Sequence, residues 1–71
     1  MKNIPVRADY MLDGTIVPLS YNYEGTTIRI DRITDVQKYG ESKINEYWVF
    51  NCISGTKKSC LLFDLHRWFL L

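Results

Sequence analysis

The chain has 71 residues, of which 46% are hydrophobic and 14% aromatic, so it has room for one domain with one core. Nine Lys and Arg residues against eight Asp and Glu residues give a formal net charge of +1, which argues against a dedicated DNA coat protein and against an acidic solvating tail. No apolar stretch of signal-peptide or membrane-spanning length occurs, and two cysteines do not make a disulfide framework, so we expect a cytoplasmic protein that does not associate with membranes.

All four glycines lie between segments of alternating or β-rich sequence, in the pairs Asp13-Gly14, Glu24-Gly25, Tyr39-Gly40 and Ser54-Gly55. Glycine in such a position is typical of tight turns that join antiparallel strands. The spacing therefore predicts a series of β-hairpins.

A two-residue turn at Asp13-Gly14 fixes the register of the first predicted hairpin. In that register one face is apolar along its whole length, with the pairs Ile4–Tyr23, Val6–Tyr21, Ala8–Leu19 and Tyr10–Val17. A shift by one residue would set each apolar side chain opposite a polar one, so turn and periodicity favour the same pairing.

The Glu24-Gly25 turn extends this hairpin to a meander of three strands. A four-residue loop keeps the apolar face continuous and sets Asn22 opposite Thr27. The polar face then carries a row across the three strands, formed by Arg7, Ser20 and Arg29.

Pro18 has no N–H group to give to the third strand, and its expected partner is Asp31. The apolar period breaks at the same place, because Ile30 and Ile33 are three residues apart instead of two. We therefore predict a β-bulge or a sharp bend at Asp31 and Arg32, a feature that lets a small sheet curl.

The second half continues the pattern of strands and turns. Residues 36–43 are polar and predict a longer connecting loop, whereas residues 45–53 are apolar on both faces and predict a central strand. A turn at residues 54–56 leads to a strand at residues 58–65, and residues 67–71 form a last short strand.

Five to six short antiparallel strands in one domain of residues 1–71 predict an all-β fold, specifically a small SH3-like barrel. An OB-fold is the nearest alternative, but it normally needs more residues and a helix. No segment here has a clear 3.6-residue period, which favours the SH3-like barrel.

No catalytic or metal site stands out. His66 is the only histidine, and although Asp64 would share its strand face, no nucleophile accompanies them, so we expect a solvated histidine in a turn. Cys52 and Cys60 become neighbours only across a three-residue turn and form no Cys-x-x-Cys pair, so we expect two inert thiols and no zinc.

A pair of carboxylates is the remaining catalytic possibility. Asp9 and Asp31 flank Pro18 on the polar face, but a cleft-forming second layer is missing, and such acids usually balance surface charges such as Arg7 and Arg29. We therefore expect no enzyme activity and no cofactor.

Recognition is the remaining class of function. The candidate binding residues are basic or aromatic, namely Arg7, Arg29, Arg32, Arg67, Tyr23 and Trp68. Basic groups with aromatic rings suit single-stranded nucleic acid, but Asp9, Asp31 and Asp35 lie in the same region and would repel phosphate. The alternative is a solvated mixture of charges over an aromatic core.

A protein partner is the other possibility, because small barrels offer sheet edges and aromatic grooves to extended peptides. The C-terminal residues 67–71 contain four large apolar residues, which either close the barrel or expose a patch for a partner. The sequence thus predicts a non-catalytic binding or adaptor module, monomeric or weakly dimeric, with weak binding of single-stranded nucleic acid as the alternative.

The chain resembles short uncharacterised proteins of Gram-positive, mainly clostridial, bacteria. The resemblance covers most of the chain and rests on the segments Ile4-Pro5-Val6, Asp13-Gly14-Thr15-Ile16-Val17-Pro18, Tyr23-Glu24-Gly25, Ile30-Asp31-Arg32-Ile33-Thr34-Asp35-Val36 and Arg67-Trp68-Phe69. In those proteins the region between Val36 and Tyr47 is usually longer or more basic. The resemblance implies a bacterial cytoplasmic domain and assigns no catalytic residue. It draws attention to Asp31, Arg32 and Asp35, for which we expect a structural role at the bend.

Overall fold

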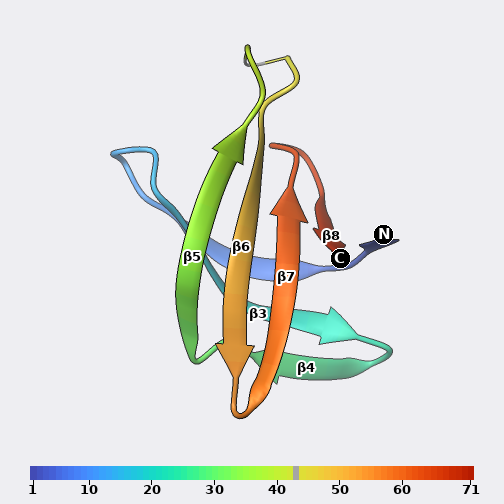
Figure 1. The fold of residues 1–71 in the computed structure, drawn as a ribbon. Helices are drawn as coiled ribbons and strands as arrows, with labels where there is room; N and C mark the ends of the chain where they lie inside the picture. The colour runs from blue at the N-terminus through green and yellow to red at the C-terminus, as the bar shows by residue number, and fades with distance from the viewer. Residues whose placement is uncertain (43) are drawn as a thin grey trace.

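Eight antiparallel strands make up the computed structural model, which describes residues 1–42 and 44–71 and has no helix among them (Figure 1). The strands are β1 (Lys2–Asn3), β2 (Val6–Tyr10), β3 (Ile16–Tyr23), β4 (Thr26–Arg29), β5 (Arg32–Tyr39), β6 (Tyr47–Ser54), β7 (Lys57–Phe63) and β8 (Trp68–Leu70). They form a five-stranded sheet, in the order β1-β8-β7-β6-β5, and a three-stranded sheet, in the order β2-β3-β4. The predicted all-β class is confirmed. The two sheets do not close into a barrel, so the predicted SH3-like barrel of five to six strands is not confirmed.

The tip of the first hairpin is longer than predicted. Met11 N–H donates to the Thr15 carbonyl at 2.8 Å and Gly14 N–H donates to the Met11 carbonyl at 3.0 Å, so the loop has three residues. Gly14 has a φ of 91°, as expected for the left-handed residue that ends such a loop.

A β-bulge restores the predicted register of this hairpin. The longer loop shifts the pairs near the tip by one residue, so that Ala8 faces Pro18 instead of Leu19. Leu19 is then left without a partner on β2, and beyond it Val6 faces Tyr21 as predicted.

The second hairpin has a shorter turn than predicted but the predicted register. Asn22 faces Thr27, and Tyr23 also pairs with Thr26, which leaves a two-residue turn at Glu24-Gly25. Both turn residues have positive φ angles, 50° and 83°, as a type I′ turn requires.

Near Asp31, where we predicted a bulge or a bend, the chain passes from the three-stranded sheet into the five-stranded sheet. Ile30 N–H donates to the Leu19 carbonyl in the small sheet, and the next amide, of Asp31, donates to the Ile53 carbonyl in the large sheet, both at 2.9 Å. The bend therefore lies at Ile30 and Asp31, one residue before the predicted position. A bulge occurs later, at Thr34, which the register with β6 skips, although its hydroxyl donates to the Asn51 carbonyl at 3.2 Å.

Strand β5 corrects the prediction of a loop at residues 36–43, because the strand continues to Tyr39. Lys43 lies outside the described residues. All residues of β5 except Ile33 are exposed, since the strand forms an edge of the large sheet. An exposed edge strand has few apolar residues, so its hydrophobic pattern resembles that of a loop.

Strand β6 is an interior strand of the large sheet, with β5 on one side and β7 on the other, as predicted for a central strand. A two-residue turn follows it, so Cys52 faces Ser59 and not Cys60. Strand β7 ends at Phe63, two residues earlier than predicted. Strand β8 lies between β7 and β1, and its pairing with both fixes the two ends of the described chain side by side (Figure 1).

The core lies between the two sheets, where β3 and β4 run across the direction of β5, β6 and β7 (Figure 1). Its buried hydrophobic residues are Ile4, Tyr21, Trp48, Phe50, Cys52, Leu61, Phe63 and Trp68. The ring centroid of Trp68 lies 4.5 Å from that of Phe63 and 5.3 Å from that of Phe50. Burial of such large rings supplies most of the hydrophobic stabilisation in a domain of this size.

Candidate functional site

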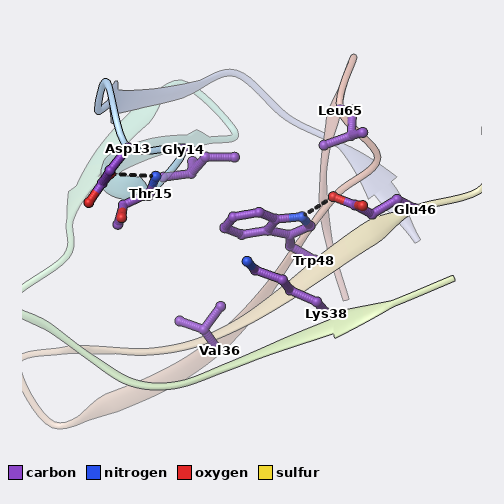
Figure 2. Close-up of a pocket in the computed structure, with 9 residues that line it drawn as sticks. Asp13, Gly14, Thr15, Val36, Lys38, Glu46, Trp48 and Leu65 are labelled. Carbon is purple, nitrogen blue, oxygen red and sulfur yellow. Dashed lines mark hydrogen bonds between the residues drawn. The ribbon is translucent and has the colours of Figure 1, made fainter. Parts of the chain in front are cut away.

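A cavity of about 580 Å³ opens between the tip of the β2–β3 hairpin and the strands β5 and β6 (Figure 2). We call it the β5 groove. Its lining residues are Asp13, Gly14, Thr15, Ile16, Val36, Lys38, Glu46, Trp48 and Leu65. The volume lies within the range of roughly 300 to 1,000 Å³ that is usual for ligand sites.

Trp48 forms the floor of the β5 groove and is held by polar contacts on two sides. Its Nε1–H donates to Glu46 Oε2 at 2.8 Å, and the ammonium group of Lys38 lies 4.2 Å from the ring centroid (Figure 2). A cation over the face of an indole is an attractive arrangement. The indole is thus fixed in orientation beside the cavity.

The hairpin wall of the β5 groove is held by Asp13. Its Oδ1 accepts a hydrogen bond from the Thr15 N–H at 2.9 Å, and the hydrogen bonds from Thr15 lower the pKa of the Asp13 carboxyl group. Next to it at the tip, Leu12 is completely exposed.

Strand β5 supplies the opposite wall and a free sheet edge. Lys38 faces Trp48 and Val36 faces Phe50 on the neighbouring strand β6, so both β5 side chains project toward the groove. Among residues 1–42 and 44–71, β5 is hydrogen-bonded to no strand other than β6. One side of its backbone therefore keeps unpaired N–H and C=O groups next to the groove.

Two of the predicted basic residues come together as expected. Arg7 faces Ser20, and Ser20 faces Arg29, which confirms the row across the three-stranded sheet. Both arginines are exposed.

The other predicted basic residues lie apart from this row. Arg32 is exposed on β5 in the five-stranded sheet, and Arg67 is exposed in the turn between β7 and β8. Tyr23 is half-buried, and the ammonium groups of Lys2 and Lys57 lie 5.0 and 6.0 Å from its ring centroid.

Trp68 corrects the prediction that it offers a stacking surface. It is only 6% exposed, and its Nε1–H donates to the Tyr10 hydroxyl at 3.3 Å. The ring is a core residue because β8 lies inside the sheet, between β7 and β1.

Asp31 has the structural role that we expected at the bend. Its Oδ2 accepts a hydrogen bond of 2.6 Å from Gly55 N–H, which joins the sheet change to the β6–β7 turn. The Asp35 carboxylate accepts hydrogen bonds from the side-chain amide of Gln37.

Asp64 and His66 do not share the strand face predicted for them, because β7 ends at Phe63. Both lie in the β7–β8 turn, where Asp64 Oδ1 accepts hydrogen bonds from the backbone N–H groups of Arg67 at 2.6 Å and His66 at 2.9 Å. The hydrogen bond from Arg67 is the main cause that lowers the pKa of Asp64. The imidazole is exposed, as predicted.

Both cysteines are free thiols. Cys52 is buried, and burial raises its pKa to about 11, while burial also raises the pKa of the half-buried Cys60. Within the described ranges, no group of three His, Cys, Asp or Glu side chains is placed to hold a metal ion.

From the sequence, Trp48 was considered only as a possible stacking surface, and the β5 groove was not predicted as a site. Sequence reasoning assigned Lys38 to a loop, and therefore did not place this residue opposite Trp48. The one available signal was Trp48 itself, on an apolar strand with a carboxylate two residues before it.

In the part of the chain that the structure describes, no helix has the length and apolar character needed to cross a bilayer. Comparisons with protein-family models, with curated proteins and with solved structures find no match to this chain.

Proposed function

We propose that this protein is a non-catalytic binding or adaptor module of a bacterial cytoplasm, which binds an extended segment of a partner protein along β5. The partner backbone pairs with the free edge of β5, and one of its side chains enters the β5 groove. The bacterial setting rests on the resemblance to clostridial proteins.

The observation that carries this proposal is the position of the cavity beside the free edge of β5, a strand of eight residues. An extended peptide added to a sheet edge gains affinity from backbone hydrogen bonds and specificity from pockets for alternate side chains.

The chemistry of the β5 groove fits one amphipathic side chain of the partner. Trp48, Val36 and Leu65 give an apolar surface, and the ammonium group of Lys38 lies at the same place. An aromatic ring with a nearby charged group is typical of residues that dominate binding energy.

The test is a selection of binding peptides from a random-peptide display library, followed by NMR mapping of the best peptide on the labelled protein. We expect amide shift changes along β5 and at the indole N–H of Trp48. Changes confined to other strands would rule the proposal out.

Two neighbouring residues of β5 provide a matched pair of variants. Lys38 projects toward the β5 groove, whereas Gln37 faces Val49 on the other side of the sheet. We expect Lys38→Ala to weaken the selected peptide by about tenfold, or about 1.4 kcal/mol, and Gln37→Ala to leave its affinity unchanged. Equal effects of both substitutions would contradict a side chain in the groove.

A further inference from the structure

The outer face of the three-stranded sheet carries a second hollow, remote from the β5 groove, of about 340 Å³. The lining residues are Pro5, Val6, Arg7, Ser20, Tyr21, Asn22 and Thr27. They include one guanidinium group, hydroxyl and amide groups, and no carboxylate.

The strand register places a second guanidinium group at the same row. Arg7 and Arg29 flank Ser20 on the two neighbouring strands, so their backbones lie about 9.6 Å apart, which is twice the spacing between strands. Side chains of this length reach toward a common point above Ser20. Arginine matches the geometry of phosphate oxygens with two parallel hydrogen bonds.

The next row adds polar groups that suit the same kind of ligand. Asn22 faces Thr27, and Asn22 Oδ1 accepts a hydrogen bond from Gly25 N–H at 3.1 Å. That bond orients the amide and leaves its NH₂ group as a donor. Two adjacent rows therefore offer donors to one anionic chain.

The structure places two of the three carboxylates that counted against an anion in the other sheet. Asp31 bonds to the β6–β7 turn, and Asp35 lies on β5 in the other sheet, next to Gln37. Asp9 is the carboxylate that stays on β2, two residues from Arg7.

We propose that this face, which we call the Arg7–Arg29 row, binds the phosphate groups of a single-stranded nucleic acid. The row is on the order of 10 Å wide, which accommodates one sugar–phosphate backbone. Tyr21 is the aromatic residue in the hollow and is 3% exposed, so bases find no ring to stack on. Binding is therefore independent of base sequence, weak and sensitive to salt.

The test is a fluorescence-anisotropy titration of a labelled 15-nucleotide oligothymidylate at low ionic strength. We expect Arg7→Ala combined with Arg29→Ala to weaken binding by about tenfold and to lower the salt slope by about 1.4, the value for two lost contacts to a single strand. Both arginines are exposed, and an unchanged melting temperature checks that the variant is folded.

A second double variant with the same loss of charge provides the control. Arg32 and Arg67 are exposed and lie outside the three-stranded sheet. We expect Arg32→Ala combined with Arg67→Ala to reduce affinity by less than about threefold, because only long-range attraction is lost. The proposal would be overturned if both double variants lost the same affinity or if the wild type did not bind the oligonucleotide. It would also be overturned if the protein bound inorganic phosphate but not the oligonucleotide. None of these outcomes bears on peptide binding at β5, which uses another sheet.

Discussion

Two tryptophans with nearly equal burial lie in regions of opposite character. Trp68 is 6% exposed and packs against Phe50 and Phe63, while Trp48 is 7% exposed and forms the floor of the β5 groove. Around Trp68 the space between the sheets is filled by rings. Beside Trp48 the hairpin tip and β5 leave about 580 Å³ empty.

The difference teaches that two core tryptophans of similar exposure can have unlike surroundings. Trp68 has apolar neighbours on strands of the same sheet, and its N–H bonds to a tyrosine. Trp48 is covered in part by the charged side chains of Lys38 and Glu46, which also touch solvent. The first arrangement stabilises the fold, whereas the second leaves a buried ring next to an open cavity.

The largest expected effect is on stability and separates the two tryptophans. Trp68→Ala should lower the free energy of unfolding by about 3 to 5 kcal/mol, because it leaves a cavity among packed rings. Trp48→Ala should cost roughly 2 kcal/mol, because its ring already borders open space and loses fewer contacts. Urea denaturation measures both values, and a larger cost for Trp48 would break the comparison.

A smaller loss of stability is expected from a substitution in the β7–β8 turn. Asp64→Ala removes the acceptor for two backbone N–H groups in the β7–β8 turn and should cost about 1 to 2 kcal/mol at pH 7. Because the pKa of folded Asp64 lies below its ordinary value of 3.8, the ionised group stabilises the fold above that pH. This contribution should disappear as the pH falls through the lowered pKa.

Asp64→Asn is the control for charge, because an amide oxygen still accepts a hydrogen bond but does not titrate. It should be more stable than Asp64→Ala at pH 7 and show less loss of stability between pH 5 and about pH 3 than the wild type. Thermal unfolding at a series of pH values gives both results. An identical pH dependence in wild type and Asp64→Asn would exclude Asp64 as a source of acid sensitivity.

The smallest effect concerns reactivity and leaves the fold unchanged. With a pKa of about 11, buried Cys52 stays protonated at pH 8 and should resist alkylation by iodoacetamide in the folded protein. Half-buried Cys60 should react faster than Cys52, and both should react at the same rate in urea. Mass spectrometry of the labelled peptides measures the ratio, and faster labelling of Cys52 would show that its side of the core opens.

The meander of the first three strands was predictable from the sequence because turns and alternation both determine pairing there. Val6–Tyr21, Asn22–Thr27 and the row of Arg7, Ser20 and Arg29 appear as predicted. The bulge at Leu19 was not predicted. The extra loop residue shifts the register by one residue, and the bulge shifts it back by one. Because the two shifts cancel, the hydrophobic pattern of the strands reveals neither of them.

The candidate site was less predictable, since it depends on how distant segments meet. The two apolar faces of β6 correctly predicted a strand with neighbours on both sides, but they did not show that only the inner face meets the second sheet. Strand β5 was missed because its exposed residues are mostly polar. The β5 groove needs both strands and the hairpin tip, so no local pattern contains it.

The consecutive amides of Ile30 and Asp31 donate to different sheets, so no flexible linker separates the two layers at this point. Any sliding of one layer against the other must break one of these two bonds first. Hydrogen exchange at these two neighbouring amides therefore reports the cooperativity of the whole domain: equal protection of both means that the layers unfold together.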